Sequence, residues 1–411
     1  MAQPQSGVPR PPGPDGASER QASDQPQLMG LAYLGFVILG VSAGLLGVAW
    51  PSVRATFNVG LDALGVVLAA TTCGYILSSL NSGRIISLVG LGPTLVVSSI
   101  VAGLGLLGFA LAPVWGALIL AAVVAGAGAA SIDAGLNTYV AVCADARAVN
   151  WLHASFGLGV ALGPAIMTVI LSSGRSWRYG YGLGCLLLLL LAAVYRLTLP
   201  QWQAVRCGTT ASRGGTIARV RSLETFYLPA IGLALLLAFS YAGTEKTAGQ
   251  WSYALFTEAR AVPVGVAGVW MTIFWSSFTV GRLLTGFLVE SVTVARLLHL
   301  SMVGMIGGSL LIAVRLDAPV SVSGLAVLGI SLAPVYPLFV ATTPRRVGVA
   351  HAPNAIGFQM SAAALGAAIV PGLVGVLAES VGLEVIGLVL VAACIAVSVL
   401  CEKVIVSKTG G

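Results

Sequence analysis

A single acidic side chain stands inside one of the most apolar stretches of the chain. The segment SIDAGLNTYVA, residues 131–141, places Asp133 after the run WGALILAAVVAGAGAA, and Asn137 follows four residues later. On a helix these two side chains share a face, because residues four apart are neighbours. An ionised Asp in hydrocarbon costs about 2.5–3.5 kcal/mol on insertion scales, so an acid kept there is a functional candidate. Reversible protonation is the chemistry that suits it, because desolvation favours the neutral acid.

A histidine stands where it could be the partner of this acid. If the chain reverses near Cys143, Asp133 and His153 lie equally far from the turn on adjacent antiparallel helices. A carboxylate beside an imidazole could hold or relay a proton. Two alternatives stay open: Asp133 only locks two helices together, or His153 faces packed helix or lipid headgroups.

Neutral polar side chains in the second part of the chain could contact a solute. The same arithmetic, with a reversal near Arg346, pairs Tyr336 with Gln359. Hydrogen-bonding groups beside an aromatic face suit a polyhydroxylated ligand, and the absence of an acid predicts ion chemistry in the first part only. Hydrogen bonding between helices is the alternative for both residues.

Four further positions complete the candidate substrate contacts. Glu245 stands beside Lys246 at the outer end of an apolar run, where an interfacial charge is common and an outer gate or sugar contact is the alternative. Trp270 and Trp275 either pack or stack on a sugar ring, and Asn81 is a weaker polar candidate.

A possible gate follows from charges at four-residue spacing. Arg282, Gly286 and Glu290 would share a helix face at the inner end of their apolar run. Together with Arg296 they could form a latch that breaks when the molecule changes conformation. Surface charges at a membrane boundary are the alternative.

The composition requires that these residues be positioned by membrane-spanning helices. Of the 411 residues, 57% are hydrophobic and 9% are charged, whereas soluble domains carry about 25% charged residues. Mean hydropathy is +0.96. Because the bilayer offers the backbone no water, apolar runs of about 20 residues must be helices. The sequence therefore predicts an all-α, multi-pass protein of the cell membrane.

Twelve spans are predicted in two six-helix bundles, residues 29–200 and 226–403. A cytoplasmic linker, 201–225, separates them, and tails cover 1–28, expected to be disordered, and 404–411. The spans are 29–52, 62–83, 92–112, 115–140, 150–172, 179–198, 226–248, 263–288, 294–315, 319–342, 354–378 and 383–401.

The distribution of basic residues predicts the orientation. When loops are assigned alternately to two sides, six Lys and Arg fall on one side: Arg54, Arg175, Arg178, Lys246, Arg260 and Arg315. The rest of the 21 share the other side with both termini and the linker, so that side is predicted to be cytoplasmic. Basic residues spread over short loops also argue against nucleic acid as a partner.

No enzyme signature is present. The sequence has no GxxxxGK[ST] loop and no HExxH, and its six cysteines have no metal-binding spacing. We therefore expect no catalytic residues, no metal and no cofactor beyond a coupling ion, either a proton or sodium. Energy should come from an ion gradient.

The two halves echo one another at an offset of about 200 residues, as in transporters built from parallel repeats. NWLHASFGLGVALGP begins at Asn150, and NAIGFQMSAAALGAAIVP begins at Asn354. Together with SIDAGLNTYVAV and GISLAPVYPLF, these segments resemble the major facilitator superfamily over residues 29–401. Within it they resemble the fucose permease-like branch, which includes animal sodium-dependent glucose transporter-like proteins.

This resemblance implies a proton-coupling role for Asp133, with Asn137 as its neighbouring asparagine. Two features depart from the family pattern. The GxxxDRxG loop signature has Ser87 and Leu88 in place of Asp and Arg, and GVSAGLLGVAWPSV lacks the acid that the fucose permease carries in its first span.

The resulting hypothesis is a monomeric secondary transporter that works by alternating access and imports a sugar or other small polar solute with protons. Gly159, Gly163 and Pro164 are similar to the GxxxGP motif of drug-exporting antiporters, so a proton-coupled exporter is the alternative. A non-transporting membrane sensor on a transporter fold is the second alternative.

Overall fold

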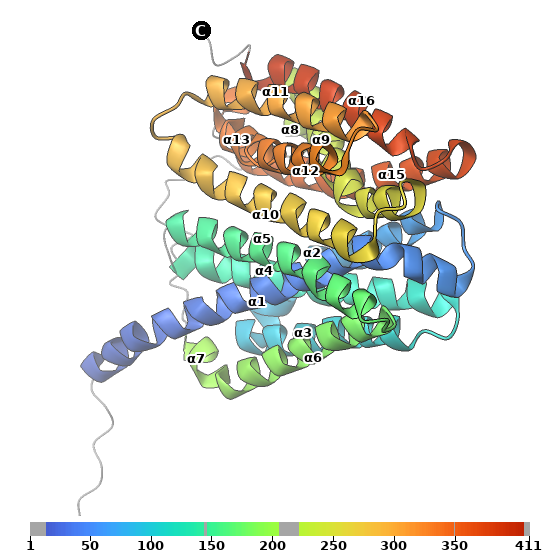
Figure 1. The fold of residues 1–411 in the computed structure, drawn as a ribbon. Helices are drawn as coiled ribbons and strands as arrows, with labels where there is room; N and C mark the ends of the chain where they lie inside the picture. Colours follow the sequence, from blue (N-terminus) through green and yellow to red (C-terminus); the bar gives the residue numbers. More distant parts are fainter. Residues whose placement is uncertain (1–13, 144–145, 205–221, 349, 407–411) are drawn as a thin grey trace, which may run out of the picture.

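The structure is a computed structural model that describes residues 14–143, 146–204, 222–348 and 350–406, and most of these residues are helical (Figure 1). The long helices of the first half are α1 (Pro14–Phe57), α2 (Ala63–Val89), α3 (Leu91–Leu111), α4 (Trp115–Cys143), α5 (Ala146–Ser172) and α6 (Arg178–Leu197). Those of the second half are α9 (Pro229–Ala254), α10 (Val264–Leu288), α11 (Val294–Ala313), α12 (Ala318–Leu332) with α13 (Val335–Ala341), α15 (Ala352–Val381) and α16 (Val385–Cys401).

Short elements complete the described chain. The helices α7 (Leu199–Ala204) and α8 (Ser222–Phe226) flank residues 205–221, which lie outside the described residues and hold most of the expected linker. Helix α14 (Thr343–Val347) precedes α15, and the π-helices η2 (Leu255–Ala259) and η3 (Glu402–Val406) extend α9 and α16.

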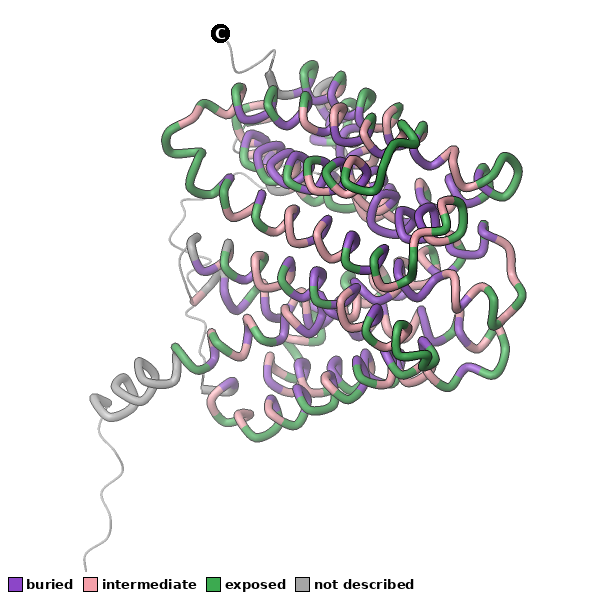
Figure 2. The backbone as a smooth tube through the Cα atoms, in the orientation of Figure 1, coloured by how far each residue is buried: buried purple, intermediate pink, exposed green. Residues whose placement is uncertain are grey.

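The described residues form twelve membrane spans, as the sequence predicts. Eleven helical segments are long and apolar enough to cross a bilayer, with α12 and α13 counted as one span. Helix α9 is the twelfth, and it is less apolar because Glu245 and Lys246 stand in its middle. Exposed residues, many of them large and apolar, follow the outward sides of the helices (Figure 2), as expected for contact with lipid.

The halves repeat the same packing order. Helix α1 packs on α5 as α9 packs on α15, α2 packs on α4 as α10 packs on α12, and α3 packs on α6 as α11 packs on α16. Among the described helices, the main contacts between the halves are those of α5 with α10, α2 with α15, and α1 with α9. In Figure 1 the blue-to-green half lies below the yellow-to-red half.

We call the end of the helix bundle where α1 begins and α16 ends the near face. The opposite end, which carries the α1–α2 and α15–α16 connections, is the far face (Figure 1).

Glycines let the halves touch between the middle of the bundle and the far face. A Cβ atom on Gly65 of α2 would lie 2.6 Å from the Cα atom of Gly372 of α15, and one on Gly47 of α1 would lie 2.5 Å from the carbonyl oxygen of Gly249 of α9. Carbon atoms in contact sit about 3.5–4.0 Å apart, so a methyl group does not fit at either position.

Two hydrogen bonds reinforce this contact. Arg54 donates to Glu258 Oε2 at 2.5 Å, and the backbone N–H of Leu61 donates to Glu379 Oε2 at 2.6 Å. Each bond joins one half to the other, because Arg54 and Leu61 belong to the first half and the two glutamates to the second. The structure is therefore closed at the far face.

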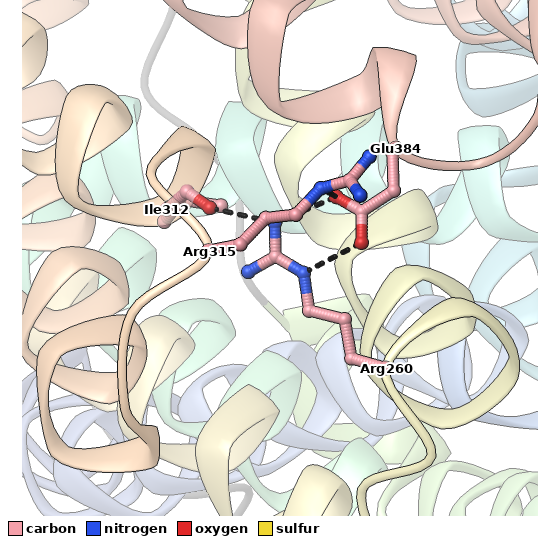
Figure 3. Close-up of polar contacts among 4 residues, drawn as sticks. All are labelled: Arg260, Ile312, Arg315 and Glu384. Atoms are coloured by element: carbon pink, nitrogen blue, oxygen red, sulfur yellow. Dashed lines mark hydrogen bonds and ion pairs between the residues drawn. The ribbon is translucent and has the colours of Figure 1, made fainter.

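A separate network joins three helix ends of the second half at the far face (Figure 3). Arg260, after η2, donates from Nη2 and Nε to the two carboxylate oxygens of Glu384, at 2.8 and 3.1 Å, and Arg315 lies 3.3 Å from Glu384 Oε2. Arg260 also donates to the carbonyl oxygen of Ile312 at the end of α11. The hydrogen bond from Arg260 and the charges of both arginines hold the pKa of Glu384 below its ordinary value.

Several helix boundaries differ from those expected. Helix α1 begins at Pro14, so residues 14–28, expected in a disordered tail, are helical; a helix extends from existing turns without a new nucleus. The runs predicted to end at 52 and 83 continue to Phe57 and Val89, and the run predicted to end at 248 continues through α9 and η2 to Ala259.

Candidate functional site

Asp133 lies in α4, in the half of that helix that approaches the near face, and its carboxylate has two neutral donors. The hydroxyl of Tyr75 in α2 donates to Oδ2 at 2.5 Å, and the side-chain amide of Asn137 donates to Oδ1 at 3.0 Å. One turn away from this contact, the hydroxyls of Ser78 and Ser131 hydrogen-bond at 2.7 Å. Asp133 thus belongs to a polar seam between α2 and α4.

Close backbone contact places Tyr75 within reach of the acid. A Cβ atom on Gly74 would lie 2.0 Å from the carbonyl oxygen of Val123, and one on Gly126 would lie 2.0 Å from that of Thr71. Because neither helix carries a side chain at these crossings, α2 and α4 approach more closely than larger residues would allow. Sequence reasoning missed Tyr75 because it paired Asp133 with the next helix along the chain.

Among the described residues, no Lys, Arg or His forms an ion pair with Asp133. A carboxylate fixed by a cation would be held in its charged form. Tyr75 and Asn137 are neutral, and each can serve as donor or acceptor, so the site can hold the carboxylate or the carboxylic acid.

The expected pair between Asp133 and His153 is wrong. The His153 ring packs edge-on against Phe36 of α1, with ring centroids 6.0 Å apart, and the charge that acts on it is that of Arg282 in α10. The reason lies in the packing order: α4 packs mainly on α2 and α3, whereas α5 packs on α1 and α10. Helices α4 and α5 are therefore not close partners, although they follow each other in the sequence.

A second charged cluster lies between α9 and α10. Glu245 Oε2 is 4.0 Å from Arg282 Nη2, and both side chains are largely buried. Tyr241, one turn before Glu245, stacks on Tyr336 of α13 with centroids 5.6 Å apart and donates to the carbonyl oxygen of Leu332 at 3.1 Å. Electrostatic interactions connect both tyrosines to Glu245 and Arg282.

This cluster corrects three expectations. Glu245 lies midway between Pro229 and Ala259, not at the outer end of its span, so the second half does contain a deep acid. Its polar neighbours made the run look finished, although Thr244, Thr247 and Gln250 are buried within the bundle. Arg282 faces Glu245, whereas Glu290 lies exposed in the turn after α10, so the expected Arg282–Glu290 latch is not formed.

Tyr336 and Gln359, expected to face each other, have different surroundings. Tyr336 stacks on Tyr241, while Gln359 is fully buried and accepts a hydrogen bond from Thr343 at 3.1 Å. The side-chain nitrogen of Gln359 is buried without a hydrogen-bond partner. The break at Pro334 between α12 and α13 turns this segment away from simple hairpin geometry.

The remaining candidates divide between packing and polar positions. Trp270 is buried edge-on against Phe256, with centroids 5.0 Å apart. Trp275 is also buried, and Lys246 Nζ lies 5.8 Å from its ring centroid. Asn81 is exposed and donates to the carbonyl oxygen of Leu77 in its own helix. Within the described part of the chain no group of His, Cys, Asp and Glu could hold a metal ion.

Twelve spanning helices in two equivalent halves, with acids buried between them, define a multi-pass membrane transporter. A family model described as Major Facilitator Superfamily matches residues 32–244, and the chain belongs to this family.

Similar proteins agree with this assignment. Over 387 residues the chain is 22% identical to the Sodium-dependent glucose transporter 1A of Mus musculus, covering 84% of this chain and 88% of that protein. Over 185 residues it is 27% identical to Bypass of stop codon protein 6 of Saccharomyces cerevisiae, and this match spans only 34% of that protein.

Solved structures share the fold. The nucleoside transporter NupG superposes with a TM-score of 0.73 at 16% identity, covering 92% of this chain and 98% of that one. The E. coli fucose:proton symporter FucP, in a variant form, superposes with a TM-score of 0.60 at 16% identity, covering 91% and 98%. At this identity the likeness concerns the fold alone.

Proposed function

We propose that this transporter carries a sugar or other small polar solute together with protons, by alternating access, and that Asp133 is the coupling acid. The observation that carries the proposal is the surrounding of Asp133. Its two oxygens accept hydrogen bonds from Tyr75 and Asn137, and no described cation fixes its charge. A coupling group must exist in both protonation states, and these neutral partners are compatible with both.

The position of Tyr75 suggests how protonation affects conformation. Tyr75 is ten residues from Gly65 on α2, about 15 Å along the helix axis. Gly65 makes the far-face contact with Gly372 of the other half. Helix α2 therefore connects the acid to the surface that must separate when the far face opens. Protonation of Asp133 weakens its charge-assisted bond to Tyr75 and so alters the forces on this helix.

The comparisons support the solute class without identifying the solute. One relative is named as a sodium-dependent glucose transporter, and one structural neighbour as a fucose:proton symporter. The basic loops predict a cytoplasmic near face, so the closed far face would be the outer one, and the solute would leave toward the cytoplasm.

The GxxxGP segment, which favours the export alternative, also has a packing role. A Cβ atom on Gly159 would lie 2.0 Å from the carbonyl oxygen of Val37, and one on Gly163 would lie 2.7 Å from the Cα atom of Gly44. The GxxxGP segment thus serves the close contact between α5 and α1, a packing role that any direction of transport can use.

The experiment is solute uptake by proteoliposomes containing the purified full-length protein. We expect an acid-outside pH gradient to drive accumulation of a labelled sugar or sugar derivative, and an inward sodium gradient at equal pH to leave uptake at the level without a gradient. Accumulation driven by sodium alone would contradict proton coupling. Absence of flux under every gradient would favour the sensor alternative.

A further inference from the structure

The second half places two basic side chains deep in the membrane. Lys246 follows Glu245 in the middle of α9, and Arg282 lies in α10, six residues before its last residue, Leu288. Basic residues at such depth are costly and normally face a polar partner or pathway. Their surroundings show how far this cost is offset within the protein.

Lys246 has no acidic partner among the described residues. Its Nζ atom lies over the ring of Trp275, 5.8 Å from the centroid, and no ion pair involves it. A cation–π contact of this kind offsets only part of the cost of placing an ammonium group deep in the membrane. The positive charge of Lys246 is therefore only partly compensated.

Arg282 is also incompletely paired. Its contact with Glu245 is long, at 4.0 Å, which is beyond hydrogen-bond distance. The Nε atom of Arg282 is buried without a hydrogen-bond partner, and its guanidinium carbon lies 4.5 Å from the ring centroid of Phe278. A guanidinium group with an unused donor is suited to bind a carboxylate with two parallel hydrogen bonds.

The two cations lie at opposite ends of one row of aromatic side chains. Trp275, Phe278 and Arg282 follow each other along one side of α10, and the rings of Trp275 and Phe278 pack edge-on at 5.7 Å. Lys246 lies against one end of this aromatic row, and Arg282 lies against the other. Tyr241 and Tyr336 stand beside Glu245 and Arg282, and the half-buried Tyr336 could contact a hydroxylated solute through its hydroxyl.

The charges of the side chains deep in the membrane indicate the charge of the solute. The charges of Asp133, Glu245, Lys246 and Arg282 sum to zero when all four side chains are ionised. A proton on Asp133 leaves one uncompensated positive charge, which a solute with one negative charge neutralises. The loaded transporter would therefore change conformation with no net charge on these side chains and the bound solute.

On the basis of the proposed function, we propose that the solute is a hydroxylated monocarboxylate, such as a hexuronate or an aldonate. Arg282 receives its carboxylate, Lys246 donates hydrogen bonds to its hydroxyl groups at the other end of the aromatic row, and one proton on Asp133 accompanies each anion. Transport of one proton with one monoanion moves no net charge. A neutral sugar carried with a proton would move one positive charge.

This difference provides the test. Proteoliposomes with the full-length protein are given an acid-outside pH gradient and labelled glucuronate, gluconate or glucose, with or without an inside-negative potassium diffusion potential. We expect uptake of the acids at a rate that the potential leaves unchanged. Glucose uptake that the potential accelerates, without uptake of either acid, would overturn the inference and leave the proposed function intact. Absence of any proton-driven uptake would overturn both.

Substitutions test the two cations. Arg282→Gln and Lys246→Gln should each raise the KM for the acid about tenfold to a hundredfold, because a hydrogen bond to a charged group contributes about 1.5–3 kcal/mol. Lys246→Arg should recover most of the affinity. Arg345→Gln, which replaces an exposed arginine of α14, is the control and should behave as wild type.

A competition measurement needs no variant and so does not depend on folding of the substituted proteins. Unlabelled glucuronate should inhibit uptake of labelled glucuronate by the wild-type protein, whereas glucuronate methyl ester, which lacks the charge, should inhibit at least tenfold less. Equal inhibition by acid and ester would show that the carboxylate is not recognised.

Discussion

A methyl group at Gly65 should shift the conformational equilibrium of the transporter. In Gly65→Ala, the added Cβ atom would lie 2.6 Å from the Cα atom of Gly372 in the other half, about 1 Å inside normal contact. Overpacking of this kind typically costs about 1–3 kcal/mol, and it acts only on the state in which the far face is closed. The population with an open far face should therefore rise about 5- to 150-fold relative to the closed one.

Hydrogen exchange at Leu61 measures this shift directly. The Leu61 N–H donates to Glu379 across the halves, so it is protected only while the far face is closed. We expect exchange of the segment around Leu61 to accelerate about 5- to 150-fold in Gly65→Ala, within the range set by the added strain.

Gly83→Ala is the matched control, because Gly83 lies in the same helix and a Cβ atom there meets nothing within 4 Å. It should leave this exchange unchanged, since it tests only the effect of alanine on α2. Equal exchange in the two variants would refute the assignment of Gly65 to the closing contact.

Three further substitutions have expected outcomes. Glu384→Gln should lower stability by about 1 kcal/mol at pH 7. The pKa of Glu384 is lowered in the folded protein, so its ionised carboxylate stabilises the fold above the ordinary glutamate pKa. This stabilisation is lost as the pH falls through the lowered pKa of Glu384, and the melting temperatures of variant and wild type should therefore converge only in strong acid. Gly159→Leu should prevent α1 from packing on α5, seen as loss of the monodisperse peak in gel filtration. Trp251→Phe removes the hydrogen bond to the carbonyl oxygen of Pro371 and should lower the free energy of unfolding by about 1 kcal/mol, seen as a lower melting temperature. An unchanged melting temperature would show that this hydrogen bond does not stabilise the fold.

The sequence was sufficient for the fold because lipid imposes length and apolarity on each span separately. Eleven of the twelve described spans are apolar enough to be placed from apolar runs alone, and a repeat of packing order follows from the duplication of the chain. The exception is α9, because its length cannot be predicted from hydropathy. Its central residues Glu245 and Lys246 are turned into the bundle, and hydropathy cannot distinguish an inward polar side chain from the end of a span.

The candidate site was predicted less completely, for a reason of topology. Asp133 and Asn137 were recognisable because they are close in sequence and local helix geometry places them together. Tyr75 and the partners of Arg282 come from helices that are distant in sequence. Pairing each helix with its successor fails when α4 packs on α2 and α5 packs on α10.

The central claim is that Asp133 couples solute movement to the proton gradient. In proteoliposomes, Asp133→Asn keeps the size of the side chain but cannot bind and release a proton in the physiological range. We predict that this variant exchanges labelled for unlabelled solute at a rate close to wild type but no longer accumulates solute under an acid-outside gradient. Asp317→Asn, at an exposed position before α12, should accumulate solute normally. Accumulation by Asp133→Asn at the wild-type level would contradict the account.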